Sequence, residues 1–327
     1  MAGLPTLCRT AALAAATIAL HACSGGSSSE PQQHTARTDL PRALTAQEQQ
    51  VQTAANAFSF ALWQKLNADQ PNDNIFTSPL SASFALGMTL NGAAGTTFSE
   101  MRSALQFGST TVTDINTGYK SLMQLLTTLD PSVTMQVANS FWYRNTFTVN
   151  KPFIDAVSSS FDATVTPLDF NDVNGSLGKI NGWVDTKTSH KIPSILDDIP
   201  RDAVMYLINA IYFKAGWREK FDPARTANGT FHGTSGDRTV PLMHRDDKMS
   251  YAETATYQAV DLPYGDSAFT MTVILPKQTS SVNDVAASLT ASSWNALTSS
   301  FATSQVDLAL PKMKLESREL TVALRVG

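Results

Sequence analysis

The chain has 327 residues, of which 43% are hydrophobic and 16% charged, and its formal net charge is −4. This composition is typical of a globular protein, and the absence of a long basic run argues against nucleic-acid binding. Both cysteines, Cys8 and Cys23, lie near the N-terminus, and the five histidines show no HxxxH or HExxH spacing. The sequence therefore predicts no disulfide framework, metal site or cofactor in the folded body.

The first 22 residues are typical of a secretory signal peptide. The apolar stretch at residues 11–20 follows Arg9 and is too short to span a bilayer as a helix. It ends in Leu20-His21-Ala22-Cys23, which resembles a bacterial lipobox, although His21 is unusual there. Lipidation of Cys23 would anchor an exported protein to the bacterial membrane or cell surface, and plain secretion with an incidental cysteine is the alternative. Residues 23–42 have the composition of a flexible tether.

Helices are predicted for most of the first half of the folded part. Thr45-Ala-Gln-Glu48 is a capping box, and apolar residues recur after it every three or four positions to about Asn67. Residues 74–78 are expected to form a short strand, and Ser78-Pro79 to start a second helix that ends near Asn91. A third helix over residues 97–105 is expected to open with a capping box. Further helices are expected over residues 115–129, 151–159 and 174–191, and strands over 135–143 and 163–169.

One polar residue interrupts the long apolar stretch at residues 204–213. Its richness in Val, Ile, Tyr and Phe predicts a strand that is covered on both faces. A buried amide without partners costs on the order of 1–3 kcal/mol, so Asn209 is expected to be a node in a buried hydrogen-bond cluster. An asparagine that only fixes the register of the strand is the alternative.

The last third of the chain predicts a second group of strands. Residues 226–248 are polar and contain three glycines, which predicts loops and short edge strands. Strands are expected over residues 257–262, 269–275 and 306–310, and short helices over 285–289 and 294–297. Ser317 is expected to cap a last helix.

Seven motifs resemble those of the serpins and occur in the serpin order along the chain. They lie at residues 74–88, 91–96, 137–143, 180–184, 209–217, 262–265 and 310–312. The resemblance covers roughly residues 47–327 and implies an α+β fold with three β-sheets and a helical bundle, in a domain over residues 43–327. It also implies a monomeric, metastable inhibitor of a serine or cysteine protease. The target protease cuts an exposed loop, which inserts into the main sheet as an extra strand and traps the acyl-enzyme.

The resemblance also assigns site residues. Ser78, Ser81 and Asn209 match the "shutter", a cluster beneath the main sheet where its strands part. Trp217 matches the "breach", where the cleaved loop starts to insert, and Lys312 matches a lysine that pairs with an acid at the loop base in some members. No catalytic residue is implied.

The resemblance stops before the segment that acts on proteases. In the serpins the last main-sheet strand, the reactive loop and two C-terminal strands follow the position of Gly327, so we expect this chain to be an inactive fragment without them. A non-inhibitory binding lipoprotein on the cell surface is the alternative function. A hydrolase is disfavoured, because no Gly-x-Ser-x-Gly elbow is present and Gly265-Asp-Ser267 lies in a predicted turn.

Overall fold

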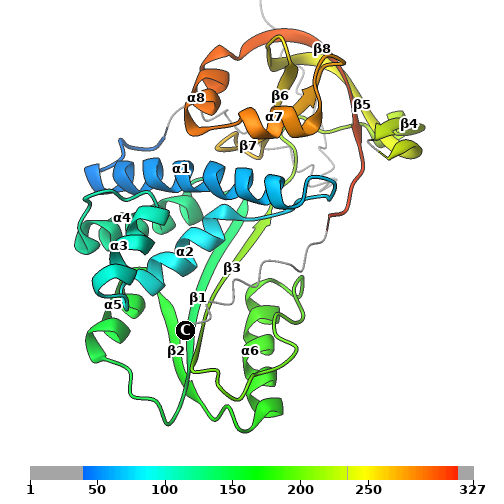
Figure 1. Cartoon of the computed structure of the whole chain (residues 1–327). Coiled ribbons are helices and arrows are strands. Elements are labelled where there is room, and N and C mark those ends of the chain that lie inside the picture. The colour runs from blue at the N-terminus through cyan, green and yellow to red at the C-terminus, as the bar shows by residue number, and fades with distance from the viewer. Residues whose placement is uncertain (1–39, 234, 316–327) are drawn as a thin grey trace, which may run out of the picture. The chain divides into compact units, whose positions relative to one another are not determined.

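The computed structural model describes residues 40–233 and 235–315. The predicted signal peptide, Cys23, most of the predicted tether and the helix predicted after Ser317 lie outside these residues. The described residues belong to a single unit, residues 35–327, in which helices dominate the first half and strands the second (Figure 1). This arrangement confirms the predicted α+β class.

The helical segments predicted for the first half are present. They are α1 (Ala46–Asp69), α2 (Pro79–Leu90), α3 (Gly95–Ala104), α4 (Val112–Thr128), α5 (Lys151–Phe161) and α6 (Val173–Lys187). The predicted cap of α3 is wrong, because the helix begins at Gly95, two residues ahead of the box expected at residue 97. Gly95 has a φ of +56°. The cap of α6 is Asp172, not Asn174. Gly175 lets the Asp172 carboxylate approach its backbone N–H, since a Cβ there would lie 2.1 Å from Asp172 Oδ2.

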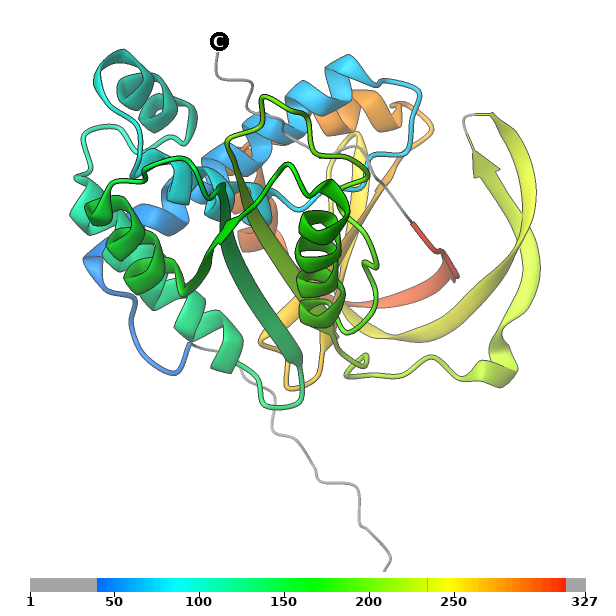
Figure 2. The same cartoon turned by 90° about the horizontal axis from the view of Figure 1, so that it is seen from below.

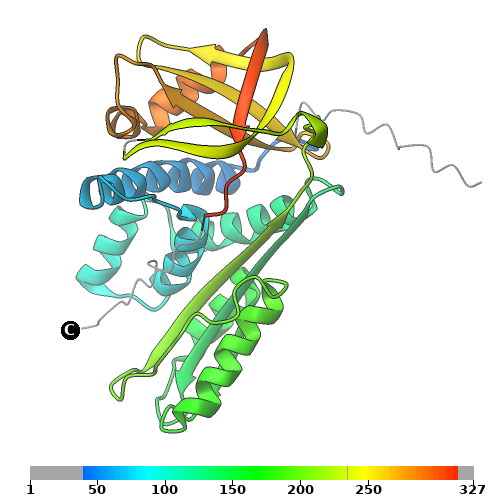
Figure 3. The ribbon, with the colours of Figure 1, turned by 90° about the vertical axis from the view of Figure 1, so that its right-hand side faces the viewer.

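A three-stranded sheet passes between two groups of these helices. Its order is β2-β1-β3, with β1 (Thr134–Arg144) parallel to β2 (Ala163–Leu168) and antiparallel to β3 (Met205–Lys214). Alternate side chains leave the sheet on opposite faces. One face packs in a core with α1, α2, α4 and α5, and the other packs against α6 (Figure 3).

The position of β3 differs from the prediction. A strand covered on both faces was expected from its apolar content, but Met205 and Phe213, at its two ends, are 41% and 40% exposed. Among residues 40–233 and 235–315, β3 is an edge strand whose only partner is β1. Some apolar side chains of β3 are therefore not covered by any described residue.

The remaining strands form a sheet around one long strand. They are β4 (Ala227–Gly233), β5 (Gly236–Glu253), β6 (Tyr257–Tyr264), β7 (Phe269–Pro276) and β8 (Ala302–Pro311), with α7 (Val282–Ser288) and α8 (Ala291–Ser300) between β7 and β8. Residues 226–248 are thus mostly an extended hairpin of β4 and β5, not loops (Figure 2). One edge of β5 pairs with β4 and then β6, and the other pairs with β8. The described strands therefore form two sheets, β2-β1-β3 and the sheet around β5, whereas the resemblance implies three sheets.

The short strand predicted at residues 74–78 is absent from the described part of the chain. A strand requires a hydrogen-bonded neighbour, and no described residue pairs with this segment, in which Phe76 is 55% exposed. The helix start predicted directly after it is confirmed. Ser78 Oγ accepts a hydrogen bond from Ser81 N, and Pro79 is the first residue of α2.

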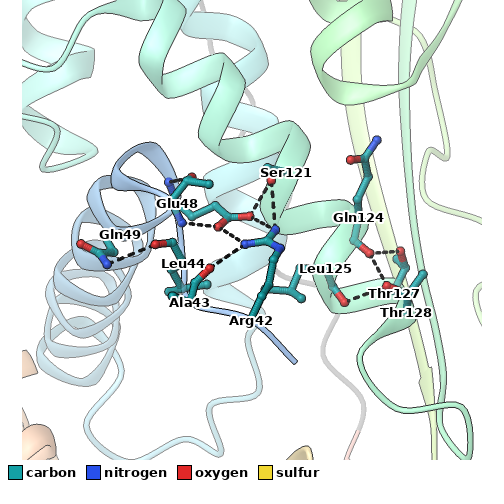
Figure 4. A network of polar contacts seen from close by, with 11 residues as sticks. Arg42, Ala43, Leu44, Glu48, Gln49, Ser121, Gln124, Leu125, Thr127 and Thr128 are labelled. Carbon is teal, nitrogen blue, oxygen red and sulfur yellow. Dashed lines mark hydrogen bonds and ion pairs between the residues drawn. The ribbon is translucent and has the colours of Figure 1, made fainter. Parts of the chain in front are cut away.

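An ion pair between the half-exposed Arg42 and the buried Glu48 holds the start of the described residues. Glu48 has no exposed surface, and its carboxylate accepts hydrogen bonds from both Arg42 Nη atoms (2.7 and 2.5 Å), Ser121 Oγ of α4 (2.5 Å) and Thr45 N (2.7 Å) (Figure 4). The Arg42 hydrogen bond, supported by those from Ser121 and Thr45, outweighs burial and lowers the pKa of Glu48 to about 2. We call Arg42, Glu48 and Ser121 the N-terminal clamp. It ties the chain ahead of α1 to both α1 and α4.

Candidate functional site

A line of hydrogen bonds crosses the middle of the three-stranded sheet. Asn209 of β3 lies directly opposite Asn139 of β1, and Asn209 Nδ2 donates to Asn139 Oδ1 at 2.8 Å. Ser81 Oγ of α2 donates to Asn209 Oδ1, and Asn139 Nδ2 donates to the carbonyl of Phe161, the last residue of α5, at 2.7 Å. We call Ser81, Asn139 and Asn209 the Asn209 cluster. It connects α2, β3, β1 and α5 through neutral side chains.

Helix α2 is held in place by α4. A Cβ at Gly87 would lie 2.6 Å from Tyr119 Cε2, so the two helices meet closely there. The Tyr119 hydroxyl lies 2.6 Å from Ser83 Oγ and donates to the Ser83 carbonyl at 3.0 Å, and its complete burial raises the pKa of Tyr119. Asn91 and Asn116 exchange a pair of side-chain hydrogen bonds at 3.0 and 2.7 Å. These contacts fix the position of α2, and with it the position of Ser81 beside β3.

The structure brings two of the three predicted cluster residues together. Ser81 and Asn209 are hydrogen-bonded, and Asn209, although half-buried, is a node as the sequence predicts. Because it also bonds α2, Asn209 does more than fix the register of β3. Ser78 is exposed, and its hydroxyl accepts from Ser81 N at 3.3 Å as the α2 cap. Ser78 therefore reaches Asn209 only through Ser81.

Sequence reasoning missed Asn139, the third member of the cluster. Asn139 is 2% exposed and lies in the middle of β1, beside the buried Ser140. A signal was available, since an amide in the buried part of each of two strands predicts a cross-strand pair whenever the strands are neighbours. The missing information was the pairing of β1 with β3, which are separated by two helices and β2 in the sequence.

The Asn209 cluster lies beneath an edge that is open in the described part of the chain. Only one edge of β3 is hydrogen-bonded, to β1, and none of the described residues pairs with the other edge. Such an edge presents a row of backbone N–H and C=O groups that an added strand can bond. The arrangement is therefore suited to accept a strand beside β3.

Aromatic rings join the carboxyl end of β3 to the second sheet. Trp217 stacks on Tyr264, with ring centroids 4.4 Å apart and an interplanar angle of 13°. Phe221 packs edge-on against Trp217 at 6.1 Å, and Phe213 packs edge-on against Tyr264 at 5.4 Å. We call these four residues the Trp217 cluster. Two backbone contacts support it, a β-bridge between Trp217 and Tyr264 and a 3.0 Å hydrogen bond from Gly265 N to Gly216 O.

Lys312 is not joined to Trp217 by a polar contact. Its side chain is exposed and makes no hydrogen bond or ion pair with another described residue, while its backbone N–H donates to Pro241 O at 2.9 Å. Leu310, two residues earlier, packs in the same apolar cluster as Trp217. The structure thus places Lys312 just past β8 without an acidic partner among the described residues.

Residues 40–233 and 235–315 contain neither a candidate metal centre nor a candidate membrane span. No group of three or more His, Cys, Asp or Glu side chains is placed to hold a metal ion. No helix in this part of the chain combines the length and apolar character needed to span a bilayer.

Comparison with known proteins identifies a family whose model matches most of this chain. Residues 53–325 match the family model described as "Serpin (serine protease inhibitor)". An uncharacterized serpin-like protein of Thermococcus kodakarensis is 30% identical over 274 residues, 83% of this chain and 63% of the relative. Neuroserpin of Gallus gallus is 30% identical over 271 residues, 79% of this chain and 66% of the relative. The chain therefore spans less than two thirds of the length of these two relatives.

A solved structure agrees in fold. The crystal structure of the thermophilic serpin tengpin in the latent state superposes with a TM-score of 0.73 at 27% sequence identity. The similarity covers 83% of this chain and 72% of that chain.

Proposed function

The chain belongs to the serpin family, and we propose that the whole protein inhibits a serine or cysteine protease as a suicide substrate, with its cleaved loop inserting beside β3. The protein acts as a trap for the protease, not as an enzyme. The observation that carries the proposal is the Asn209 cluster, which holds β3 to α2 and β1 beside an edge that has no partner among the described residues. An inserting strand would gain main-chain hydrogen bonds along this edge, each worth about 1 kcal/mol net.

The Asn209 cluster has a defined role in this proposal. Insertion requires that β3 keeps its place while its free edge takes a new neighbour. Asn209 is bonded to α2 through Ser81 and to β1 through Asn139, so β3 is held from below and from one side. We assign Ser81, Asn139 and Asn209 to the shutter, and Ser78 supports them as the cap of α2.

The Trp217 cluster is the proposed starting point of insertion. It lies at the carboxyl end of β3, where Phe213 is exposed and the aromatic stack connects the two sheets. Lys312 is proposed to pair with an acid outside the described residues, because its exposed ammonium group has no partner within them.

We also propose that the mature protein is exported and anchored to the bacterial membrane or cell surface by lipid on Cys23. The lipobox at residues 20–23 and the Gly- and Ser-rich tether after it support this proposal. Cells fed a palmitate analogue should label the protein, and Cys23→Ser should abolish the label. A mature N-terminus elsewhere than residue 23 would contradict it and favour plain secretion.

Inhibition is tested with the whole protein, which is incubated with trypsin-, chymotrypsin-, subtilisin- and papain-like proteases and run on a denaturing gel. The proposal predicts a covalent complex of one inhibitor and one protease, and no complex with a protease whose nucleophile is replaced by alanine. Cleavage of the whole protein without formation of a complex would support the alternative, a non-inhibitory binding protein. Gel filtration of the free protein tests the expected monomer.

A further inference from the structure

The buried carboxylate of Asp130 has no part in the proposed insertion, yet it joins the two sheets. Asp130 lies between α4 and β1 and is 3% exposed. Its Oδ1 accepts hydrogen bonds from Ser132 N at 2.9 Å and Ser132 Oγ at 2.6 Å. Its Oδ2 reaches the other sheet and accepts from Asp266 N, in the turn between β6 and β7, at 2.8 Å.

The turn approaches Asp130 so closely that only glycine fits at its first position. Gly265 has a φ of +47°, a conformation that other residues rarely adopt. A Cβ on Gly265 would lie 2.1 Å from Ser132 Oγ and 3.1 Å from Asp130 Oδ2. The turn is therefore pressed against the segment that begins β1.

The same turn carries the ring that stacks on Trp217. Tyr264 immediately precedes Gly265, and its carbonyl accepts a hydrogen bond from Ser267 N at 2.7 Å. Gly265 N in turn bonds Gly216 O, next to Trp217. Asp130, the turn, Tyr264 and Trp217 thus form a continuous line of contacts.

Asp130 is ionised at neutral pH. Burial alone would raise its pKa, but hydrogen bonds from Ser132 and from the backbone N–H groups of Asp266 and Ala268 outweigh burial and hold the pKa below the usual range. Hydrogen bonds to an ionised acceptor are about twice as strong as those between neutral groups. The carboxylate is therefore a strong anchor for the turn.

A purely local role does not account for these contacts. Asp284 at the start of α7 also accepts from a neighbouring serine, through Ser281 N at 3.1 Å and Ser281 Oγ at 2.7 Å. Asp284 completes the capping box of its own helix, whereas Asp130 Oδ2 bonds a residue 136 positions away. The long-range bond is the feature that requires a further explanation.

We propose that Asp130 is a positioning residue whose carboxylate holds the β6–β7 turn so that Tyr264 stacks on Trp217 at the carboxyl end of β3. The inference rests on the proposed function only where it takes this end as the starting point of insertion. Without the Asp130 carboxylate, Trp217 loses a fixed stacking partner, while the Asn209 cluster is left intact.

Near-ultraviolet circular dichroism of the full chain tests the proposal. The signal of Trp217 is the difference between the wild-type spectrum and that of Trp217→Phe. Asp130→Ala should lose most of this signal, and Asp130→Asn should retain part of it, because the amide oxygen still accepts hydrogen bonds. Asp284→Ala is the matched control, since it removes a similar carboxylate–serine contact far along the chain, and it should retain the whole signal.

Two outcomes would overturn the proposal. A full Trp217 signal in Asp130→Ala would overturn it, and so would an equal loss in Asp284→Ala, which would indicate general loosening. If Asp130→Ala does not fold, Asp130→Asn and Gly265→Ala decide, since both disturb the same contact and should weaken the same signal. If the whole protein fails to inhibit any protease while the expected spectral changes are seen, the proposed function is refuted and this inference stands.

Discussion

The middle and the carboxyl end of β3 are held by different kinds of contact. In the middle, neutral side chains of the Asn209 cluster bond β3 to α2 and β1. At the carboxyl end, the rings of the Trp217 cluster stack between the two sheets, and a buried carboxylate, Asp130, holds the turn that carries Tyr264.

The difference lies in how each region responds to a change. Amide hydrogen bonds are directional, and removal of one partner leaves a buried donor or acceptor unpaired, at a cost of about 1–3 kcal/mol. Ring contacts are less directional, and a stacked pair contributes about 0.5–1.5 kcal/mol beyond the area it buries. Loss of one side chain in the middle of β3 is thus expected to disrupt the whole Asn209 cluster. Loss of one ring at the carboxyl end is expected to weaken the Trp217 cluster only in part.

The largest effect is expected at the carboxyl end, from Gly265→Ala. The left-handed φ and the clash with Ser132 Oγ should together lower the free energy of unfolding by about 3 kcal/mol. Gly108→Ala is the matched control, because Gly108 has a φ of +55° and open space where a Cβ would lie. It should cost only about 1–2 kcal/mol. Equal losses in urea melts would show that the turn is not pressed against the start of β1.

The next largest effect is expected in the middle, from Asn209→Ala. The substitution removes the side-chain partner of the Ser81 hydroxyl and of Asn139 Oδ1 and should cost about 2 kcal/mol of unfolding free energy. Asn228→Ala, at an exposed position of β4, should cost less than about 0.5 kcal/mol. A shift for Asn209→Ala as small as that of its control would contradict a node in the middle of β3.

A double-mutant cycle separates the two serines. Ser81→Ala and Asn209→Ala should show a coupling of about 1 kcal/mol, because both remove the same hydrogen bond. Ser78→Ala removes the hydroxyl that caps α2 and should by itself lower the free energy of unfolding by about 1 kcal/mol. Its coupling with Asn209→Ala should stay within about 0.3–0.5 kcal/mol. Strong coupling of Ser78 would restore it to the cluster that the sequence resemblance assigned.

The smallest effect is expected from acid, and it should separate the two regions. The pKa of Asp130 in the folded protein is lowered, so its contribution to stability is complete above its ordinary value of 3.8 and is lost as pH falls through the folded value. The Asn209 cluster contains no group that titrates there. The Trp217 signal should therefore weaken in acid in the wild type. Asp130→Asn should show the weaker signal at all pH values, and an acid transition that persists in this variant would assign the change to another group.

The sequence predicts the elements well because their signals are local. Capping residues such as Thr45 and Ser78 and the apolar periodicity of α1 locate helix starts and faces without knowledge of the fold. Asn209 is predictable for a similar reason, since an amide in an apolar strand needs a partner wherever it lies.

Long-range pairing sets the limit of this prediction. Asn139 belongs to the site only because β1 pairs with β3, and Asp130 only because the β6–β7 turn folds back on the start of β1. The strand at residues 74–78 was predicted on local pattern alone and fails in the described residues for lack of a neighbour. The length of β5 could not be predicted from the sequence pattern, because an exposed strand face tolerates polar residues.

The N-terminal clamp has a mechanical consequence. A pull on the chain at Leu40 reaches Arg42 first, and Arg42 passes it through the Glu48 carboxylate to α1 and, through Ser121, to α4. Tension is thus shared between two helices before the first turn of α1 can unwind. If lipid on Cys23 holds the protein to a membrane, force on the tether is transmitted through this ion pair to α1 and α4 before it acts on the rest of the fold.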